Sequence, residues 1–289
     1  MPTPEKTEAP EQTAAPTEQP APAPANPLDT GAPRGTGAPA PASTAALAAF
    51  SATSARSVEA GDAAAPEGTA QPDAALPLSG VLVGIDPGHQ ARANREQELV
   101  SPGGKATKDK VSSGTAGVKT RVAEYKVNLD VSLALRDALQ AQGATVYMTR
   151  ETHDVDISNI ERAQMMNEHG VDIVLRIHCN GSENRSAQGI GLYIRKTGEG
   201  ADECYRAAEA LLPAMVEATG AKATGIHKSD SYSGLNWSTV PSILVEMGYM
   251  SNAEEDVKLN DPDYQGKLVA GMVEGVARYM GKSDESAES

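Results

Sequence analysis

Four polar side chains in this sequence have the types and positions needed to bind a metal ion and to move a proton. His89 ends the segment VLVGIDPGH, His178 comes near the end of VDIVLRIHCN, and Glu246 lies in SILVEMG. Glu124 lies on the inward stripe of an expected helix, three residues before Val127. Two imidazoles and one carboxylate, from His89, His178 and Glu124, form a donor set that suits Zn²⁺ and leaves a fourth tetrahedral position for water.

Glu246 is the carboxylate that remains once those three side chains are assigned to a metal ion. Zinc-bound water loses a proton near neutral pH, with a pKa of about 7 in known hydrolytic sites. A nearby carboxylate can take that proton and pass it to a leaving amine. The four residues together therefore predict a hydrolase of amide bonds, with Glu246 as its catalytic residue and Zn²⁺ as its cofactor.

Each of these residues also has an ordinary structural interpretation. A lone histidine near a strand end is more often a hydrogen-bonded structural residue than a ligand, and a glutamate in a first helical turn, such as Glu124, complements the helix dipole. The repetition of polar residues at three strand ends favours a site, because parallel strands deliver such side chains to one edge of a sheet. Surface or capping roles explain His153 and His169, whereas His227 lies in an irregular stretch that we expect to face a substrate.

Apolar patterns predict the strands and helices that position these residues. Buried or alternating apolar runs predict strands at 81–89, 144–149, 171–180, 188–195 and 242–248. Helices are expected between them, and their order along the chain is typical of an α/β fold. We therefore predict a twisted, largely parallel sheet with helices on both faces.

Helix boundaries can be predicted from capping residues. Ser158 and Glu161 form an S-x-x-E capping box ahead of a helix at 159–169. Asp261 and Pro262 begin the last helix as N-cap and first residue. Pro213 is expected to kink or break the helix at 201–219. The stretches 90–121 and 220–240 show no regular period and are expected to be long loops, the first of them functional because of its length.

Composition divides the chain into three parts. Residues 1–78 contain 14 of the 19 prolines, and they are otherwise mostly small or polar. We expect a disordered Pro/Ala/Thr-rich spacer there, with at most a weak local helix at 45–50, because the segment cannot bury enough apolar surface to offset its chain entropy. Residues 79–281 are expected to form the zinc-binding catalytic domain, followed by an acidic tail at 282–289.

Charge and hydropathy exclude several classes of partner. The formal net charge is −14 and no basic stripe is visible, which argues against nucleic acid and against an anionic membrane surface. There is no run of 18 apolar residues, so no transmembrane segment is expected.

The first residues lack the basic and apolar regions of a signal peptide. Pro/Ala/Thr-rich spacers ahead of a folded domain, like the one expected at 1–78, are commoner outside cells. We therefore expect an extracellular or cell-envelope protein whose export or anchor segment is missing from the sequence shown.

The two cysteines, Cys179 and Cys204, have no metal-type spacing. Cys204 falls on the apolar stripe of a helix and is expected to be a core thiol. Cys179 follows His178 on a strand, so the two side chains should point to opposite faces. We therefore expect neither a disulfide nor a Cys–His nucleophile pair. Separately, we expect the protein to be a monomer.

Four motifs extend over the foldable part of the chain. They are VGIDPGH at 83–89, RVAEYKVNLDVSLAL at 121–135, RIHCN at 176–180 and VPSILVEMGYMSN at 240–252. In this order they resemble the zinc-dependent N-acetylmuramoyl-L-alanine amidases that degrade bacterial cell walls. The resemblance begins at about residue 81 and includes none of the first 78 residues.

The resemblance implies both a metal site and a substrate. It implies a single Zn²⁺ held by His89, Glu124 and His178, with Glu246 as the catalytic glutamate. It also implies that the substrate is peptidoglycan, cut between the lactyl group of N-acetylmuramic acid and the L-alanine that begins the stem peptide. The sequence departs from the family pattern at Arg176, where a small serine is common, and in the long loop at 90–121.

Two other functions are compatible with parts of this pattern. The same chemistry fits a zinc peptidase that cuts within the stem peptide, because the choice of scissile bond depends on loops. A wall-binding or regulatory homologue without catalysis would share the fold, but it would be expected to lack one of the four polar residues. This chain has all four.

Overall fold

The computed structural model describes residues 75–283. Most of the expected spacer, including the local helix at 45–50, lies outside the described residues, and so does most of the acidic tail. Leu78, which the sequence placed in the spacer, is fully buried in the main core, and its backbone N–H donates to the Gln142 carbonyl at 2.8 Å. The packed part of the chain therefore begins slightly before residue 79.

Six strands form one sheet in the described part of the chain, in the spatial order β4-β1-β5-β8-β6-β7. The strands β4, β1, β5 and β8 are parallel neighbours, whereas β6 runs antiparallel to β8 and parallel to β7. This confirms a largely parallel sheet. Its strands are β1 (Leu82–Pro87), β4 (Thr145–Met148), β5 (Ile173–Asn180), β6 (Ile190–Arg195), β7 (Ala223–Ser229) and β8 (Ser242–Tyr249).

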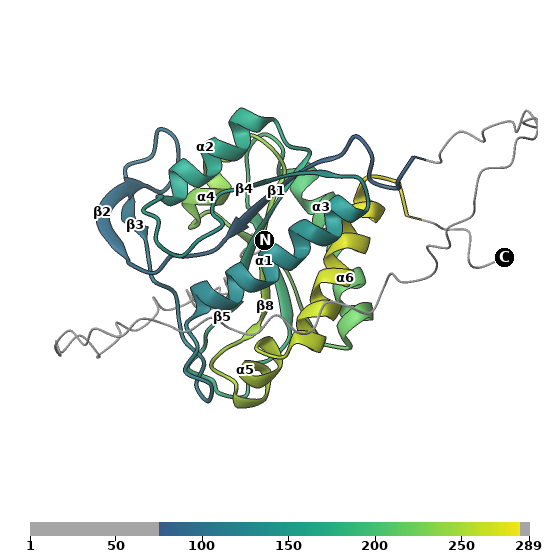
Figure 1. The fold of residues 1–289 in the computed structure, drawn as a ribbon. Helices are drawn as coiled ribbons and strands as arrows, with labels where there is room; N and C mark the ends of the chain where they lie inside the picture. The colour runs from purple at the N-terminus through teal and green to yellow at the C-terminus, as the bar shows by residue number, and fades with distance from the viewer. Residues whose placement is uncertain (1–74, 284–289) are drawn as a thin grey trace, which may run out of the picture. The chain divides into compact units, whose positions relative to one another are not determined.

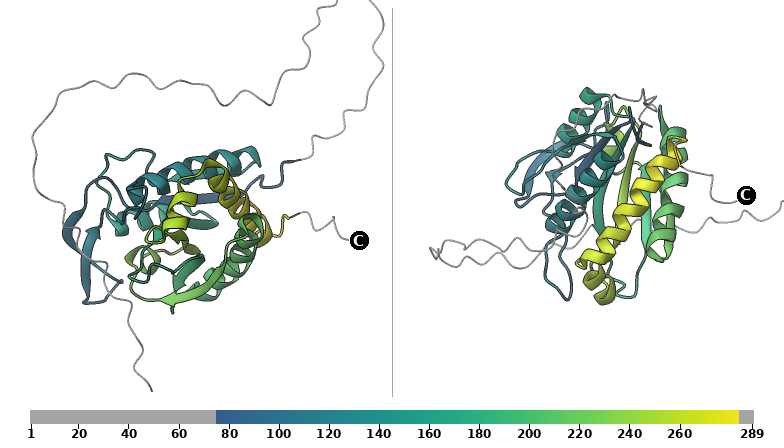
Figure 2. Two further views of the ribbon diagram at one scale, coloured as in Figure 1. Left: turned by 90° about the horizontal axis from the view of Figure 1, so that it is seen from below. Right: turned by 45° about the vertical axis from the view of Figure 1, so that its right-hand side comes forward.

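Helices cover both faces of this sheet, as predicted (Figure 1). The larger core lies between the sheet and α1 (Glu124–Ala141), α3 (Ala201–Thr219) and α6 (Pro262–Tyr279), of which α3 and α6 lie side by side (Figure 2). A smaller apolar cluster on the other face includes Met166 of α2 (Asn159–His169). Among the described residues, no helix is both long and apolar enough to cross a bilayer.

The predicted caps are present at the helix ends. The Ser158 hydroxyl accepts from the Glu161 N–H at 3.2 Å, and the Glu161 carboxylate accepts from the Ser158 N–H at 2.7 Å, so both hydrogen bonds of the capping box form. Gly170 ends the same helix in the left-handed conformation, with φ of 57°. Asp261 caps α6, and Pro262 is its first residue.

The two stretches predicted as loops contain regular structure. The first contains an antiparallel hairpin of β2 (Asn94–Leu99) and β3 (Thr107–Val111), and the second contains β7 and the short helix α4 (Ser233–Asn236). Another short helix, α5 (Ala253–Leu259), follows β8. The hairpin strands are mostly polar, and cross-strand pairs such as Lys110–Glu96 at 2.7 Å hold them together. Polar strands of this kind carry no apolar alternation, which is why the sequence did not indicate them.

The helix α3 is not broken at Pro213, so of the two predicted outcomes, a kink or a break, the break is wrong. The helix runs without interruption from Ala201 to Thr219, with Pro213 inside it. Proline removes the hydrogen bond to the carbonyl four residues earlier, which belongs to Glu209. Both residues lie on the exposed side of the helix, where water can replace the missing donor.

Candidate active site

His89 lies in a tight turn just beyond the carboxyl end of β1. Its backbone has φ of 61°, a left-handed conformation that is uncommon for a residue with a side chain. Gly88 precedes it, and a β-carbon at that position would lie 2.3 Å from the His178 ring. Glycine at 88 therefore lets the two imidazoles approach each other.

Two buried arginines hold this turn through its carbonyl oxygens. Arg162 donates to the carbonyls of Pro87 at 2.8 Å and His89 at 3.0 Å. Arg150 donates to the carbonyls of Pro87 and Gly88, at 2.9 Å in each case. Both arginines are nearly inaccessible to solvent, at 1% for Arg162 and 3% for Arg150. They fix the backbone that projects His89, and the sequence analysis did not identify them.

Asp86 balances part of this buried positive charge. Its carboxylate lies 2.8 Å from Arg162 and 2.9 Å from Arg176, and it accepts a hydrogen bond from the Thr149 hydroxyl at 2.5 Å. Burial alone would raise the pKa of Asp86, but the Arg176 and Arg162 guanidiniums outweigh it and hold that pKa below its usual range. Arg176, the departure from the family pattern, is thus one partner of a buried ion-pair network.

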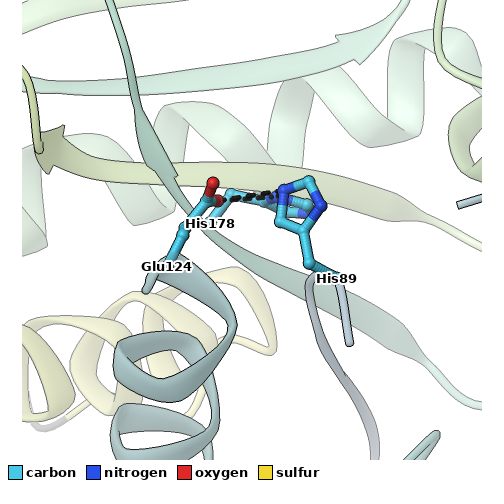
Figure 3. A group of neighbouring side chains, drawn as sticks. All are labelled: His89, Glu124 and His178. Atoms are coloured by element: carbon cyan, nitrogen blue, oxygen red, sulfur yellow. Dashed lines mark hydrogen bonds and ion pairs between the residues drawn. The ribbon is translucent and has the colours of Figure 1, made fainter. Parts of the chain in front are cut away.

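Three side chains meet at the carboxyl ends of the parallel strands (Figure 3). We call His89, Glu124 and His178 the His–Glu–His cluster. His89 Nε2 lies 3.1 Å from Glu124 Oε1, and His178 Nδ1 lies 3.3 Å from the same oxygen. The two ring nitrogens are 3.2 Å apart. The ligand atoms thus form a nearly equilateral triangle, and these three residues could hold a metal ion.

Surrounding hydrogen bonds set the orientation of the cluster. His89 Nδ1 lies 3.0 Å from the Ser112 carbonyl, which can only accept, so the proton of the neutral ring belongs on Nδ1 and the lone pair on Nε2. Glu124 is the first residue of α1 and accepts from the backbone N–H groups of Thr115 at 2.9 Å and Cys179 at 3.0 Å. The segment that contains Ser112 and Thr115 belongs to the loop expected to be functional.

Burial and neighbouring charges place two of the three ligands, His178 and Glu124, in the protonation states that metal binding requires. Burial lowers the pKa of His178 to about 4, so its ring is neutral at pH 7. Burial opposes ionisation of Glu124, but the neighbouring His89 and His178 outweigh it and hold the Glu124 pKa well below its usual range. A neutral imidazole and an ionised carboxylate are both ready to donate electron pairs. Burial would lower the pKa of the third ligand, His89, but the Glu124 carboxylate outweighs the effect of burial and raises that pKa.

Glu246 lies beside the cluster, on β8. It is the register partner of His178 on the neighbouring parallel strand, so their side chains extend on the same face of the sheet. The Glu246 residue is 8% exposed, and its Oε2 atom has no hydrogen-bond partner among the described residues. Burial, and then repulsion by Glu124, raise the Glu246 pKa well above its usual value. The carboxylate is therefore a stronger base than it would be in water.

The remaining histidines and the cysteines lie outside the His–Glu–His cluster. His153 meets Tyr125 edge-on, His169 stacks on Tyr147 and His227 stacks on Tyr193, with ring centroids 5.2, 3.9 and 4.8 Å apart, respectively. Both cysteines are free and buried, as predicted. One sign of the missed arginines was present in the sequence, because Arg162 falls on the same buried helical stripe as Ala163 and Met166.

Several proteins of similar sequence and fold are N-acetylmuramoyl-L-alanine amidases. The family model for N-acetylmuramoyl-L-alanine amidases matches residues 83–278. The germination-specific N-acetylmuramoyl-L-alanine amidase of Bacillus subtilis (strain 168) is 28% identical over 228 residues, which is 74% of this chain and 85% of that protein.

Solved structures of amidases share the fold. The N-acetylmuramyl-L-alanine amidase from Mycobacterium smegmatis superposes with a TM-score of 0.66 at 24% identity, covering 71% of this chain and 99% of that one. The N-acetylmuramoyl-L-alanine amidase from Clostridium difficile 630 has a TM-score of 0.59 at 27% identity, covering 70% of this chain and 98% of that one. This chain therefore belongs to the N-acetylmuramoyl-L-alanine amidase family, enzymes that hydrolyse an amide bond of peptidoglycan.

Proposed function

We propose that this enzyme is Zn²⁺-dependent, with one Zn²⁺ bound by the His–Glu–His cluster and Glu246 as the catalytic residue. The observation that carries the proposal is the spacing of the three ligand atoms, which are 3.1 to 3.3 Å apart. Zinc bonds of roughly 2.0 to 2.1 Å in a tetrahedral site require ligand atoms about 3.3 Å apart. The donor set, two imidazoles and one carboxylate, also matches the preference of this ion.

In this mechanism the His–Glu–His cluster, Glu246 and the two buried arginines each have a separate role. When bound, Zn²⁺ supplies Lewis acidity that activates water and polarises an amide carbonyl. The Glu246 carboxylate accepts the proton of the attacking water, which its raised pKa favours. The protonated Glu246 then donates to the amine nitrogen of L-alanine as the amide bond to the lactyl group breaks. Arg150 and Arg162 keep His89 in place through the backbone of its turn.

The bond that is cut can be determined by digesting purified peptidoglycan and measuring the masses of the new ends. We expect free lactyl carboxyl groups on the glycan and stem peptides that begin with L-alanine. A zinc peptidase would instead leave shortened stems attached to the glycan. A wall-binding homologue without catalysis would leave the polymer intact.

We also propose the layout of the chain and its place of action. Residues 79–281 with the few preceding residues act as the catalytic domain, the chain before them as a spacer, and residues 282–289 as an acidic tail. The Pro/Ala/Thr-rich composition supports the spacer. Because peptidoglycan lies outside the cytoplasm, the enzyme acts in the cell envelope. The proposal includes a monomeric enzyme, which the mass of the protein in solution tests.

A further inference from the structure

We propose that Lys108, Tyr232 and Tyr193 form a subsite beside Glu246 that binds a carboxylate of the stem peptide. This inference rests on the proposed amidase function and identifies the part of the substrate that the subsite selects. The β2–β3 hairpin provides Lys108, the residue before α4 is Tyr232, and Tyr193 belongs to β6.

The strand β6 places Tyr193 on the same face of the sheet as Glu246. Gly191 is the antiparallel partner of Glu246, and Tyr193 follows two residues later, so its side chain extends on the same face. Gly191 has no side chain, and a β-carbon there would lie 2.4 Å from the Thr224 hydroxyl and 3.7 Å from the His227 ring, both of which come from β7. The rings of Tyr193 and His227 stack with centroids 4.8 Å apart. A planar apolar surface thus begins one strand away from the proposed catalytic carboxylate.

Tyr232 extends this surface towards the hairpin. Its ring meets Tyr193 edge-on, with centroids 5.4 Å apart, and Lys108 Nζ lies 6.0 Å from the Tyr232 centroid. Burial is the main cause that raises the Tyr232 pKa. The ammonium of Lys108 is therefore within roughly 12 Å of the Tyr193 ring, the length of three to four extended residues.

Lys108 is a cation without an ion-pair partner among residues 75–283. Lys110, two residues along β3, lies 2.7 Å from Glu96. The cross-strand partner of Lys108 is Glu98, whose Oε2 accepts from the Ile160 N–H at 3.1 Å and whose buried Oε1 has no hydrogen-bond partner among the described residues. Burial lowers the Lys108 pKa against the opposing attraction of Glu98, which is near enough to act on the charge but forms no ion pair with it. A ligand carboxylate would supply the missing partner.

The chemistry of the substrate determines which part can supply this carboxylate. The lactyl carboxyl group of N-acetylmuramic acid is part of the amide bond to L-alanine. The glycan therefore offers no free carboxylate next to the bond that is cut. The stem peptide can carry acidic residues within a few residues of the cut bond, in free or amidated form. A cation next to an apolar ring surface thus distinguishes a free carboxylate from a carboxamide.

The test uses two synthetic N-acetylmuramoyl-dipeptides that differ only in one group, a carboxylate or a carboxamide on the second residue. KM and kcat are measured for the zinc-loaded full chain and for Lys108→Met. The matched control is Lys105→Met, which removes an exposed charge from the same hairpin. Calorimetry with Glu246→Gln, alone and combined with Lys108→Met, measures binding of both compounds without turnover.

We expect the parent enzyme and Lys105→Met to favour the carboxylate compound by about tenfold in KM, as a hydrogen bond to a charged group implies. Lys108→Met should remove this preference and leave kcat unchanged. Equal KM values for both compounds in the parent enzyme would overturn the subsite and leave the amidase function intact. An equal loss for both compounds in Lys108→Met would show a structural role and also overturn it. Absence of cleavage at the lactyl–alanine bond would instead count against the proposed function, and the calorimetric preference would still decide the subsite.

Discussion

Two carboxylates lie at one edge of the sheet, Glu124 at the start of α1 and Glu246 on β8, and the protein holds them in opposite ways. Glu124 alone accepts three hydrogen bonds, from the N–H groups of Thr115 and Cys179 and from the Asn128 amide. Glu246 has a buried carboxylate oxygen with no partner among the described residues. Donors to an ionised carboxylate lower its pKa and weaken it as a base. Glu124 therefore stays ionised, whereas Glu246 can gain and lose a proton.

The largest effect should come from breaking the cluster itself. Removing one of three ligands in His178→Ala leaves two, which cannot complete a tetrahedral site, so both bound zinc and amidase activity should be lost. Metal analysis of the purified variant, beside the parent with about one equivalent of zinc, measures this. His169→Ala is the control, because that ring stacks on Tyr147 and lies outside the cluster. Full zinc content in His178→Ala would show that the metal is bound elsewhere.

The next effect should come from Glu246. Glu246→Gln keeps the size of the side chain and removes its ability to accept a proton, so kcat should fall by about 10² to 10⁴. Zinc should remain bound, because Glu246 is not one of the three ligands. Glu124→Gln is the matched comparison and should instead weaken zinc binding. Cleavage by Glu246→Gln at near the parent rate would mean that the roles of the two glutamates are exchanged.

A smaller effect is expected from the arginine that supports the His89 turn. Arg162→Met leaves the Asp86 carboxylate with one guanidinium fewer and removes the Arg162 hydrogen bonds to the carbonyls of Pro87 and His89, of which only Pro87 keeps Arg150 as a donor. Breaking such a buried pair typically costs about 3 to 5 kcal/mol of unfolding free energy. Without the hydrogen bonds from Arg162, the turn that carries His89 is held less firmly, so zinc binding should also weaken by roughly 10- to 100-fold.

Urea unfolding and zinc titration measure both effects, with Arg136→Met as the control. Arg136 forms ion pairs with Asp137 and Glu151, whose side chains are 66% and 61% exposed, so its loss should cost below about 1 kcal/mol. If Arg162→Met is no less stable than Arg136→Met, the buried network does not hold the turn. An unchanged zinc affinity would separate fold stability from the positioning of His89.

The parts of the molecule that could be predicted from sequence are those with a local physical cause. The strand Ile173–Asn180 begins with three consecutive apolar residues, and the Ser158–Glu161 box starts α2 through its own side chains. The same reasoning brought the three cluster residues and Glu246 to one edge of the sheet, because parallel strands end together.

The parts that could not be predicted depend on contacts between distant segments. The β2–β3 hairpin is mostly polar, and it is tied to α2 by hydrogen bonds from the Ile160 N–H to Glu98 and from the Asn159 amide to the Lys110 carbonyl. Arg150 and Arg162 act on backbone carbonyls, which no sequence pattern displays. Arg176, the departure from the family pattern, pairs with Asp86 on the neighbouring strand β1, and no local pattern in the sequence indicates this contact.

The smallest effect is expected from removing the spacer at the amino terminus, because neither folding nor the active site should depend on it. A chain that begins at Asp73 keeps the buried Leu78 and should match the full chain in melting temperature, zinc content and kcat, because the four site residues all come after β1. Leu78→Ala in that shortened chain is the positive control. It removes a side chain that is 0% exposed and should cost about 2 to 5 kcal/mol of unfolding free energy. A clearly lower melting temperature for the shortened chain itself would mean that residues 1–72 pack on the domain and are not a spacer.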